Sequence, residues 1–189
     1  MSALAGPGYA VIPDYAGARL VQSLLTSRLD RQRLGQFQAA GVGVGGRHAI
    51  RTDIRGDRIA WVDEPRAVAE AEFLADLDVL RLNLNRSLMV GLHDVQMHFA
   101  SFAPGFGYVR HLDRSPGGLD RVVSVVYYLN TEWEPGDGGE LQIETDAGPV
   151  LVSPRADTLV MFLSDRFIHA VLPALRERHS LTGWFHRRA

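Results

Sequence analysis

The sequence contains neither cysteine nor lysine, and all of its 20 basic residues are arginine. Without thiols the chain can form no disulfides and no thiolate metal sites, so a bound metal would have to be held by histidine and carboxylate side chains. No apolar run approaches the roughly 20 residues that a membrane span requires. The net charge of -2 provides no strongly basic surface. We therefore expect neither a nucleic-acid partner nor a membrane partner.

The length and composition fit one domain with a full hydrophobic core. The chain has 189 residues, of which 46% are hydrophobic, and it shows no linker, repeat or low-complexity segment. No secretory signal is recognisable. We expect a single domain over residues 1–189 in a cytoplasmic, monomeric protein.

The hydrophobic pattern changes from helical to strand-like near Gly91. Before it, residues 16–25 have helical spacing, and an apolar stripe (Phe73, Leu77, Leu80, Leu84 and Leu88) predicts a second helix that opens near Glu64-Pro65. Strands are predicted at 9–12, at the end of 53–61 after a charged turn, and at 95–99, 122–129, 141–144, 150–152, 158–162, 169–172 and 180–186. Many short strands joined by Gly/Pro turns favour a sandwich or jelly roll. Residues 1–92 would then form a helical N-terminal support with a substrate loop, and residues 93–189 the β core.

One stretch of the strand-rich half, residues 108–113 (YVRHLD), carries candidate metal ligands. His111 and Asp113 are two residues apart, so in an extended segment both side chains leave the same face. His169 would complete a facial triad of two imidazoles and one carboxylate, which holds non-haem Fe(II). Arg178, on the next predicted strand, could pair bidentately with a carboxylate. On its own, His-x-Asp also fits a strand-end histidine beside a solvated aspartate; the strand-rich context and Arg178 favour the metal site.

Further motifs are spread over nearly the whole chain. They are residues 53–61 (DIRGDRIAW), 107–113 (GYVRHLD), 126–130 (VYYLN) with Trp133, 138–141 (GGEL), 164–166 (SDR), and His169 through Pro173 to Arg178 and Trp184. With them the chain resembles the Fe(II)/2-oxoglutarate-dependent prolyl hydroxylases. The resemblance is to the branch that contains the hydroxylases of hypoxia-inducible factor and their bacterial relatives.

The resemblance implies a mainly β (α+β) fold, a double-stranded β-helix of the jelly-roll, cupin-like type with N-terminal helices packed on it. It implies an enzyme, a 2-oxoglutarate-dependent dioxygenase of the prolyl 4-hydroxylase type that uses Fe(II), 2-oxoglutarate and O2, with ascorbate as an additional reductant. By the family pattern, His111, Asp113 and His169 hold iron and Arg178 pairs with the distal carboxylate of 2-oxoglutarate. Other implied co-substrate contacts are the hydroxyls of Tyr128 and Thr182 and the pocket-lining side chains of Val126, Leu141, Val171 and Trp184.

Two departures from the family pattern stand out. Phe102 occupies the position where the family usually has tyrosine, so one hydroxyl contact to the co-substrate is expected to be missing. Residues 114–120 form a slightly longer segment than their counterpart. Asp57 and Arg121 match positions beside the family's protein-substrate groove.

Residues 41–53 match the loop that closes over the peptide in the family. Their glycines (Gly41, Gly43, Gly45 and Gly46) favour a mobile loop, and an ordinary flexible connection is the alternative. We predict a lid that is ordered by bound peptide. Hydrogen exchange across residues 39–53 that is equally slow with and without substrate would contradict this.

The function expected from the resemblance is hydroxylation of a prolyl residue in a protein substrate, with succinate and CO2 as co-products. Elongation factor Tu is a candidate substrate by family analogy alone. The alternatives are a related oxygenase acting on another residue or a free amino acid, and a non-catalytic jelly-roll sensor that binds a metal or a small acid. The remaining histidines (His48, His93, His98, His179 and His186) are interpreted as surface or structural residues.

Overall fold

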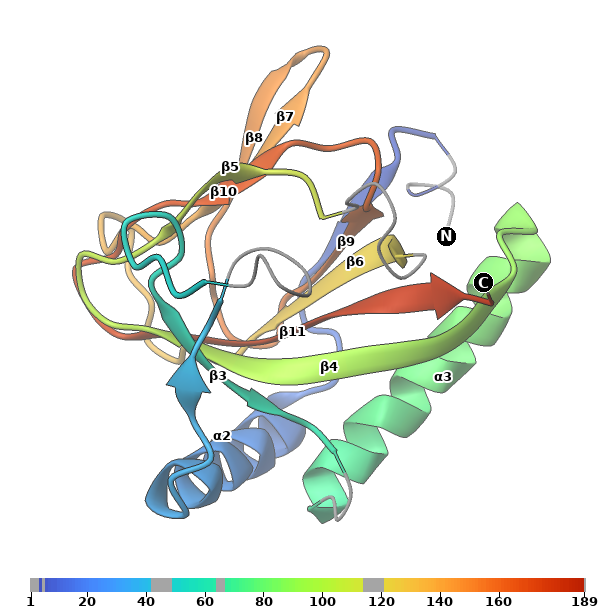
Figure 1. Ribbon diagram of the computed structural model, residues 1–189. Helices are drawn as coiled ribbons and strands as arrows, with labels where there is room; N and C mark the ends of the chain where they lie inside the picture. The colour runs from blue at the N-terminus through green and yellow to red at the C-terminus, as the bar shows by residue number, and fades with distance from the viewer. Residues whose placement is uncertain (1–3, 5, 42–48, 64–66, 114–120, 189) are drawn as a thin grey trace.

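The computed structural model describes residues 4, 6–41, 49–63, 67–113 and 121–188, and in these residues two antiparallel sheets face each other. The larger sheet has the order β1-β9-β6-β11-β4-β3-β2 and the smaller one β5-β10-β7-β8. Figure 1 shows helices α2 and α3 beneath the larger sheet and the smaller sheet on its other side. The predicted jelly roll with helical support is confirmed.

The bounds of the elements are as follows. The strands are β1 (Tyr9–Ile12), β2 (Gln38–Ala39), β3 (Asp57–Trp61), β4 (Leu92–Phe102), β5 (Tyr108–His111), β6 (Arg121–Tyr128), β7 (Leu141–Thr145), β8 (Gly148–Val152), β9 (Leu159–Leu163), β10 (His169–Val171) and β11 (Arg178–Arg187). The helices are α2 (Ala18–Arg33) and α3 (Val68–Leu88).

The main hydrophobic core lies between the helices and the larger sheet. Phe73, Leu77 and Leu84 of the predicted α3 stripe are fully buried there, while Leu80 and Leu88 are partly buried. Tyr127 of β6 faces this side, stacks on Phe73 with ring centroids 4.8 Å apart, and donates its hydroxyl to Asp157. Because side chains alternate along a strand, its neighbour Tyr128 must face the space between the sheets.

The second core fills part of that space. Tyr128, Leu141, Ile143, Val160 and Phe162 are all almost completely buried in it. These residues come from β6, β7 and β9, so both sheets contribute to this layer. The remaining part of the space forms the pocket described below.

Several predicted boundaries differ from the observed ones. Helix α2 continues to Arg33, eight residues beyond the predicted end. The prediction ended early because the later turns bury the polar residues Ser27 and Arg28 rather than an apolar stripe. Strand β2 has only two residues and was not predicted. The strands predicted at 9–12 and at the end of 53–61 are present as β1 and β3, and with β2 they extend the larger sheet. The glycine-rich residues 42–48 and the Glu64-Pro65 helix start lie outside the described residues.

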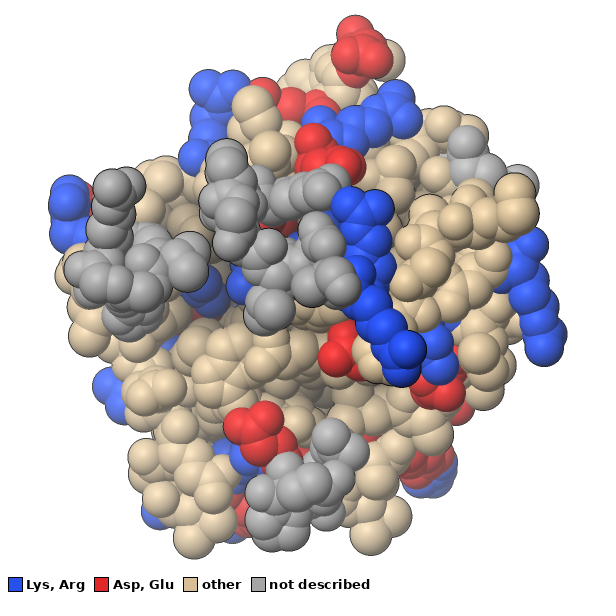
Figure 2. Space-filling view, turned by 45° about the vertical axis from the view of Figure 1, so that its right-hand side comes forward, with Lys and Arg blue, Asp and Glu red and all other residues tan. Residues whose placement is uncertain are grey.

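Neither described helix is long and apolar enough to cross a membrane. On the face shown in Figure 2, arginine and acidic side chains are interspersed and form no large area of one sign among the described residues.

Candidate metal centre and co-substrate pocket

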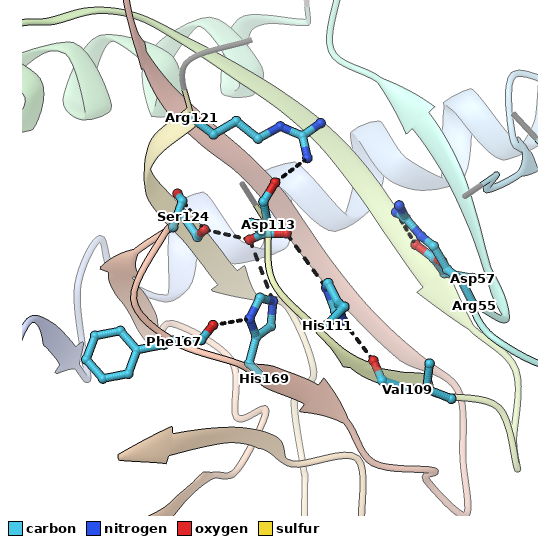
Figure 3. A network of polar contacts seen from close by, with 10 residues as sticks. Arg55, Asp57, Val109, His111, Asp113, Arg121, Ser124, Phe167 and His169 are labelled. Atoms are coloured by element: carbon cyan, nitrogen blue, oxygen red, sulfur yellow. Dashed lines mark hydrogen bonds and ion pairs between the residues drawn. The ribbon is translucent and has the colours of Figure 1, made fainter. Parts of the chain in front are cut away.

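The three predicted metal ligands meet between the two sheets. His111 and His169 are cross-strand partners in β5 and β10, and Asp113 follows two residues after the end of β5. One ligand atom from each residue lies within 4.8 Å of the other two. Asp113 Oδ1 is 3.7 Å from His111 Nε2, and Asp113 Oδ2 is 3.6 Å from His169 Nε2. Figure 3 shows the three side chains pointing toward one another.

Each histidine is oriented so that one nitrogen faces this cluster. The other nitrogen, Nδ1, lies 2.8 Å from the Val109 carbonyl in His111 and 3.1 Å from the Phe167 carbonyl in His169. A carbonyl oxygen can only accept, so Nδ1 carries the proton and Nε2 keeps its lone pair for a metal. Burial and the nearby His169 lower the pKa of His111 to about 4, which keeps this ring neutral at neutral pH.

Asp113 supplies the negative charge that a divalent cation requires. Burial acts to raise its pKa, but the two histidines and a hydrogen bond from Ser124 outweigh this effect and the pKa is lowered. The Ser124 hydroxyl donates to Asp113 Oδ2 over 2.6 Å and also contacts Ser164. Two neutral imidazoles and one carboxylate on one side of an open pocket fit Fe(II) and leave further coordination positions accessible.

The triad lies at a cavity of about 280 Å³ between the sheets, here called the central pocket. This volume is close to the lower end of the range for small-molecule sites. The structure brings twelve of the thirteen predicted site residues to its lining. They are Asp57, Phe102, His111, Asp113, Arg121, Val126, Leu141, His169, Val171, Arg178, Thr182 and Trp184. The thirteenth, Tyr128, is buried beside Arg178, with its ring centroid 5.1 Å from Cζ.

Arg178 is a buried cation within this lining. Only 2% of it is exposed, and its Nε donates to the Gly139 carbonyl over 2.8 Å. Its guanidinium carbon is 5.1 Å from the Tyr128 ring and 5.4 Å from the Phe102 ring. Arg178 forms no ion pair with the residues that the structure describes. A buried charge needs a partner, so this guanidinium fits the carboxylate of a small acid.

The Tyr128 hydroxyl is a second indication that a small acid binds here. It is buried and forms no hydrogen bond of good geometry with the described residues, although the Arg178 guanidinium lies close to it. Burial raises the pKa of Tyr128 to about 12, so the hydroxyl keeps its proton and can donate. Phe102 has no hydroxyl to add, as expected from the sequence. Thr182 is on the neighbouring strand, and its hydroxyl lies 3.1 Å from that of Ser180.

The two residues predicted to bind the protein substrate occupy different environments. Asp57 is 3% exposed, and both its carboxylate oxygens accept hydrogen bonds from Arg55, over 2.7 and 3.0 Å. Arg121 lies 3.5 Å over the Trp184 ring and donates to the Asp113 carbonyl over 3.3 Å. Arg121 therefore remains the better placed of the two to meet a ligand that enters the central pocket.

Among the lining residues to which sequence reasoning gave no role in the site are four with polar groups: Arg55, Tyr108, Ser124 and His98. Strand alternation could have placed Ser124 and His98 on the pocket face, because Ser124 is two residues before Val126, and His98 pairs with Thr182 across β4 and β11. His98 is completely buried between Trp61 and Trp184, with ring centroids 4.8 and 5.6 Å away. Neither of its nitrogens has a hydrogen-bond partner among the described residues.

His98 should make the protein less stable in acid. Burial, then Arg55 and Arg121, lower its pKa to about 3 against the attraction of Asp57 and Asp113. Between that value and the ordinary pKa near 6.5, the unfolded chain binds a proton that the folded chain does not. The free energy of unfolding therefore falls as pH falls, by about 2 kcal/mol from pH 7 to pH 5 for this group.

Urea unfolding of a His98→Leu variant at both pH values measures this contribution. We expect a smaller loss of stability in acid than in the unmodified protein. His93→Leu is the control, since this histidine of the same strand is exposed. An unaltered dependence in His98→Leu would show that other groups cause the loss.

Comparisons with known proteins place this site in a family. Residues 97–186 match the model of the 2OG-Fe(II) oxygenase superfamily. The human protein named Prolyl hydroxylase EGLN3 is 33% identical over 93% of this chain and 73% of its own length. Human Egl nine homolog 1 is 31% identical over 94% of the chain. The chain spans only 43% of that protein, or about half the length of the curated relatives of this type.

Solved structures show the same fold. A prolyl-4-hydroxylase from Pseudomonas putida superimposes with a TM-score of 0.90 at 42% identity, covering 99% of this chain and 96% of that one. A prolyl hydroxylase from Trichoplax adhaerens, solved with a fragment of hypoxia inducible factor, gives 0.87 at 30% identity, covering 98% and 86%.

A jelly roll that holds two histidines and an aspartate beside a buried arginine fits an iron-dependent oxygenase that uses a 2-oxo acid. More particularly, the chain belongs to the prolyl hydroxylases of the 2OG-Fe(II) oxygenase superfamily. The matching family is named for 2-oxoglutarate and Fe(II), and the donor set of the site fits both.

Proposed function

We propose that this enzyme hydroxylates a prolyl residue of a protein substrate. One oxygen atom of O2 enters the new alcohol and the other enters succinate, which forms from 2-oxoglutarate with loss of CO2. The observation that carries the proposal is the joint presence of the triad and the buried Arg178 in one pocket. A barrel that only binds a metal has no need of the second feature.

Different residues of the central pocket have different roles. His111, Asp113 and His169 would hold Fe(II), which when bound supplies the oxidising chemistry for an unactivated C–H bond. The Arg178 guanidinium and the Tyr128 hydroxyl are placed to bind one carboxylate of 2-oxoglutarate. Val126, Leu141 and Val171 are apolar and largely buried, so they exclude water from the co-substrate.

The protein substrate would enter on the side of Arg121 and Trp184. Arg121 stacks on the indole and forms no ion pair with the described residues, so its guanidinium is available to a carbonyl or carboxylate of the substrate. The Trichoplax relative was solved with a peptide of hypoxia inducible factor, which supports a polypeptide substrate here. Elongation factor Tu is the candidate we propose to test, with the enzyme acting as a cytoplasmic monomer.

The test measures oxygen incorporation by mass spectrometry. Purified enzyme with Fe(II), 2-oxoglutarate and O2 is incubated with elongation factor Tu, with its proline-containing peptides, and with the same peptides carrying alanine in place of proline. We expect a mass gain of one oxygen atom on proline, matched by succinate. Oxidation of another residue or of a free amino acid would favour the related-oxygenase alternative. Absence of 2-oxoglutarate turnover under all conditions would favour the sensor.

A further inference from the structure

The side chains of Arg55, Tyr108 and His111 form a continuous series of contacts. It leads from the edge of the central pocket to His111, which is a metal ligand. The rings of Tyr108 and His111 are stacked, with centroids 3.5 Å apart and planes inclined by 15°. The guanidinium carbon of Arg55 lies 5.0 Å from the centre of the Tyr108 ring. Arg55 is therefore in contact with the aromatic ring that supports the ligand, although it does not belong to the triad itself.

Arg55 is held rigidly. Its Nε and terminal nitrogen donate to the two oxygens of Asp57, and this pair is almost fully removed from water, with side-chain exposures of 15% and 2%. A bidentate pair of this kind fixes both distance and plane. The backbone adds two links to the strand of the ligand, from Gly56 N–H to the Gly107 carbonyl (3.0 Å) and from Val109 N–H to the Ile54 carbonyl (2.9 Å).

His111 has particular need of such support. Its counterpart His169 is more deeply enclosed, with 6% of its side chain exposed and Phe162 against its ring at 4.6 Å. The His111 side chain is 17% exposed, and its only hydrogen bond within the described residues runs from Nδ1 to the Val109 carbonyl. The ring also contacts His169, with centroids 4.2 Å apart and planes inclined by 55°, so neither this tilted contact nor the hydrogen bond lies flat against the ring and fixes its plane. The stack with Tyr108 fixes that plane.

We propose that Arg55, clamped by Asp57, is a positioning residue that presses Tyr108 against His111 and thereby sets the metal affinity of the triad. In this assignment the buried Asp57 acts through Arg55, and the segment before β3 is mechanically connected to the metal centre. The role does not depend on which substrate the enzyme uses. Groups that orient the ligands of a metal typically change its affinity by about 10- to 100-fold when they are removed.

The test is a titration of the metal-free protein with Mn²⁺, and with Co²⁺ to record the absorption spectrum of the bound ion. We expect Tyr108→Leu and Arg55→Met to bind Mn²⁺ roughly 10-fold or more weakly and to change the Co²⁺ spectrum. Tyr108→Phe keeps the stacked ring, so it should retain the original affinity. Arg110→Met is the matched control, because this exposed arginine on the same strand pairs with Glu144 on the outside.

Circular dichroism and thermal unfolding establish that each variant is folded. If Tyr108→Leu does not fold, Arg55→Met still tests the proposal, because it leaves both aromatic rings in place. Unchanged Mn²⁺ affinity in a folded Arg55→Met protein would overturn the role of Arg55. A loss of affinity in Tyr108→Phe equal to that in Tyr108→Leu would assign the effect to the hydroxyl and contradict the stacking explanation.

Discussion

Replacing Asp113 with alanine is expected to abolish turnover while the chain still folds. The substitution removes the only carboxylate of the triad, whose oxygens lie 3.6 and 3.7 Å from the two imidazole nitrogens. Two neutral histidines alone bind a divalent cation far more weakly. The loss should exceed the roughly 10- to 100-fold produced by changes outside the ligand shell. Asp113 lies beyond the end of β5, so its removal breaks no strand pairing.

Succinate formation and metal titration measure this effect, and circular dichroism checks the fold. His169→Ala should behave in the same way. Asp78→Ala is a suitable control, since this aspartate is exposed on α3 and pairs only with Arg81 among the described residues. Ser124→Ala should give an intermediate loss, because it removes the hydrogen bond to Asp113 but leaves the carboxylate. Full activity of Asp113→Ala at ordinary iron concentration would refute the triad assignment.

Part of the metal site could be predicted because two of its ligands lie within one short segment of the sequence. His111 and Asp113 are two residues apart, and the period of a strand places such residues on one face. The partner His169 was proposed from its residue type and then from the family pattern, not from spacing, because 58 positions separate it from His111 and their meeting depends on the register of β5 with β10. No periodicity within either segment determines that register.

The surroundings of the ligands could not be predicted for the same reason. The Arg55–Tyr108 contact joins residues that β3, α3 and β4 separate in the sequence, and it depends on an isolated bridge between them. Asp57 was recognised as part of a motif, but its burial and its bidentate pair with Arg55 depend on the packing of β3 beside β4. His98 looked like a polar residue in an alternating strand, whereas the neighbouring Trp61 and Trp184 exclude water from it.

The fold, too, could be predicted only where the sequence pattern within a segment is strong. The apolar stripe of α3 and the buried run of β6 were readable because their patterns are strong over many residues. α2 was predicted too short, because its last turns are held by polar contacts such as the Arg31–Glu70 pair. β2 was missed because two residues carry no periodic signal.

Replacing Arg178 with lysine should weaken 2-oxoglutarate binding while leaving metal binding intact. Lysine cannot form the planar fork that matches a carboxylate, and it loses the hydrogen bond from Nε to the Gly139 carbonyl. Burial already lowers the pKa of Arg178, and a lysine in the same place would give up its proton more readily. The expected loss is about 1.5–3 kcal/mol, the range of a charge-assisted hydrogen bond, or roughly 10- to 150-fold in affinity.

The apparent KM for 2-oxoglutarate and a Mn²⁺ titration separate the two effects. Arg176→Lys is the matched control, because this exposed arginine pairs with Asp137 outside the central pocket and should leave both quantities unchanged. Tyr128→Phe should raise the same KM by a smaller factor, since it removes a neutral donor and leaves the charge. An unchanged KM in Arg178→Lys would show that another residue binds the distal carboxylate. Equal losses of metal and co-substrate affinity would show that the substitution disturbs the whole pocket, because Arg178 packs on Phe102 and Tyr128 and not on the triad.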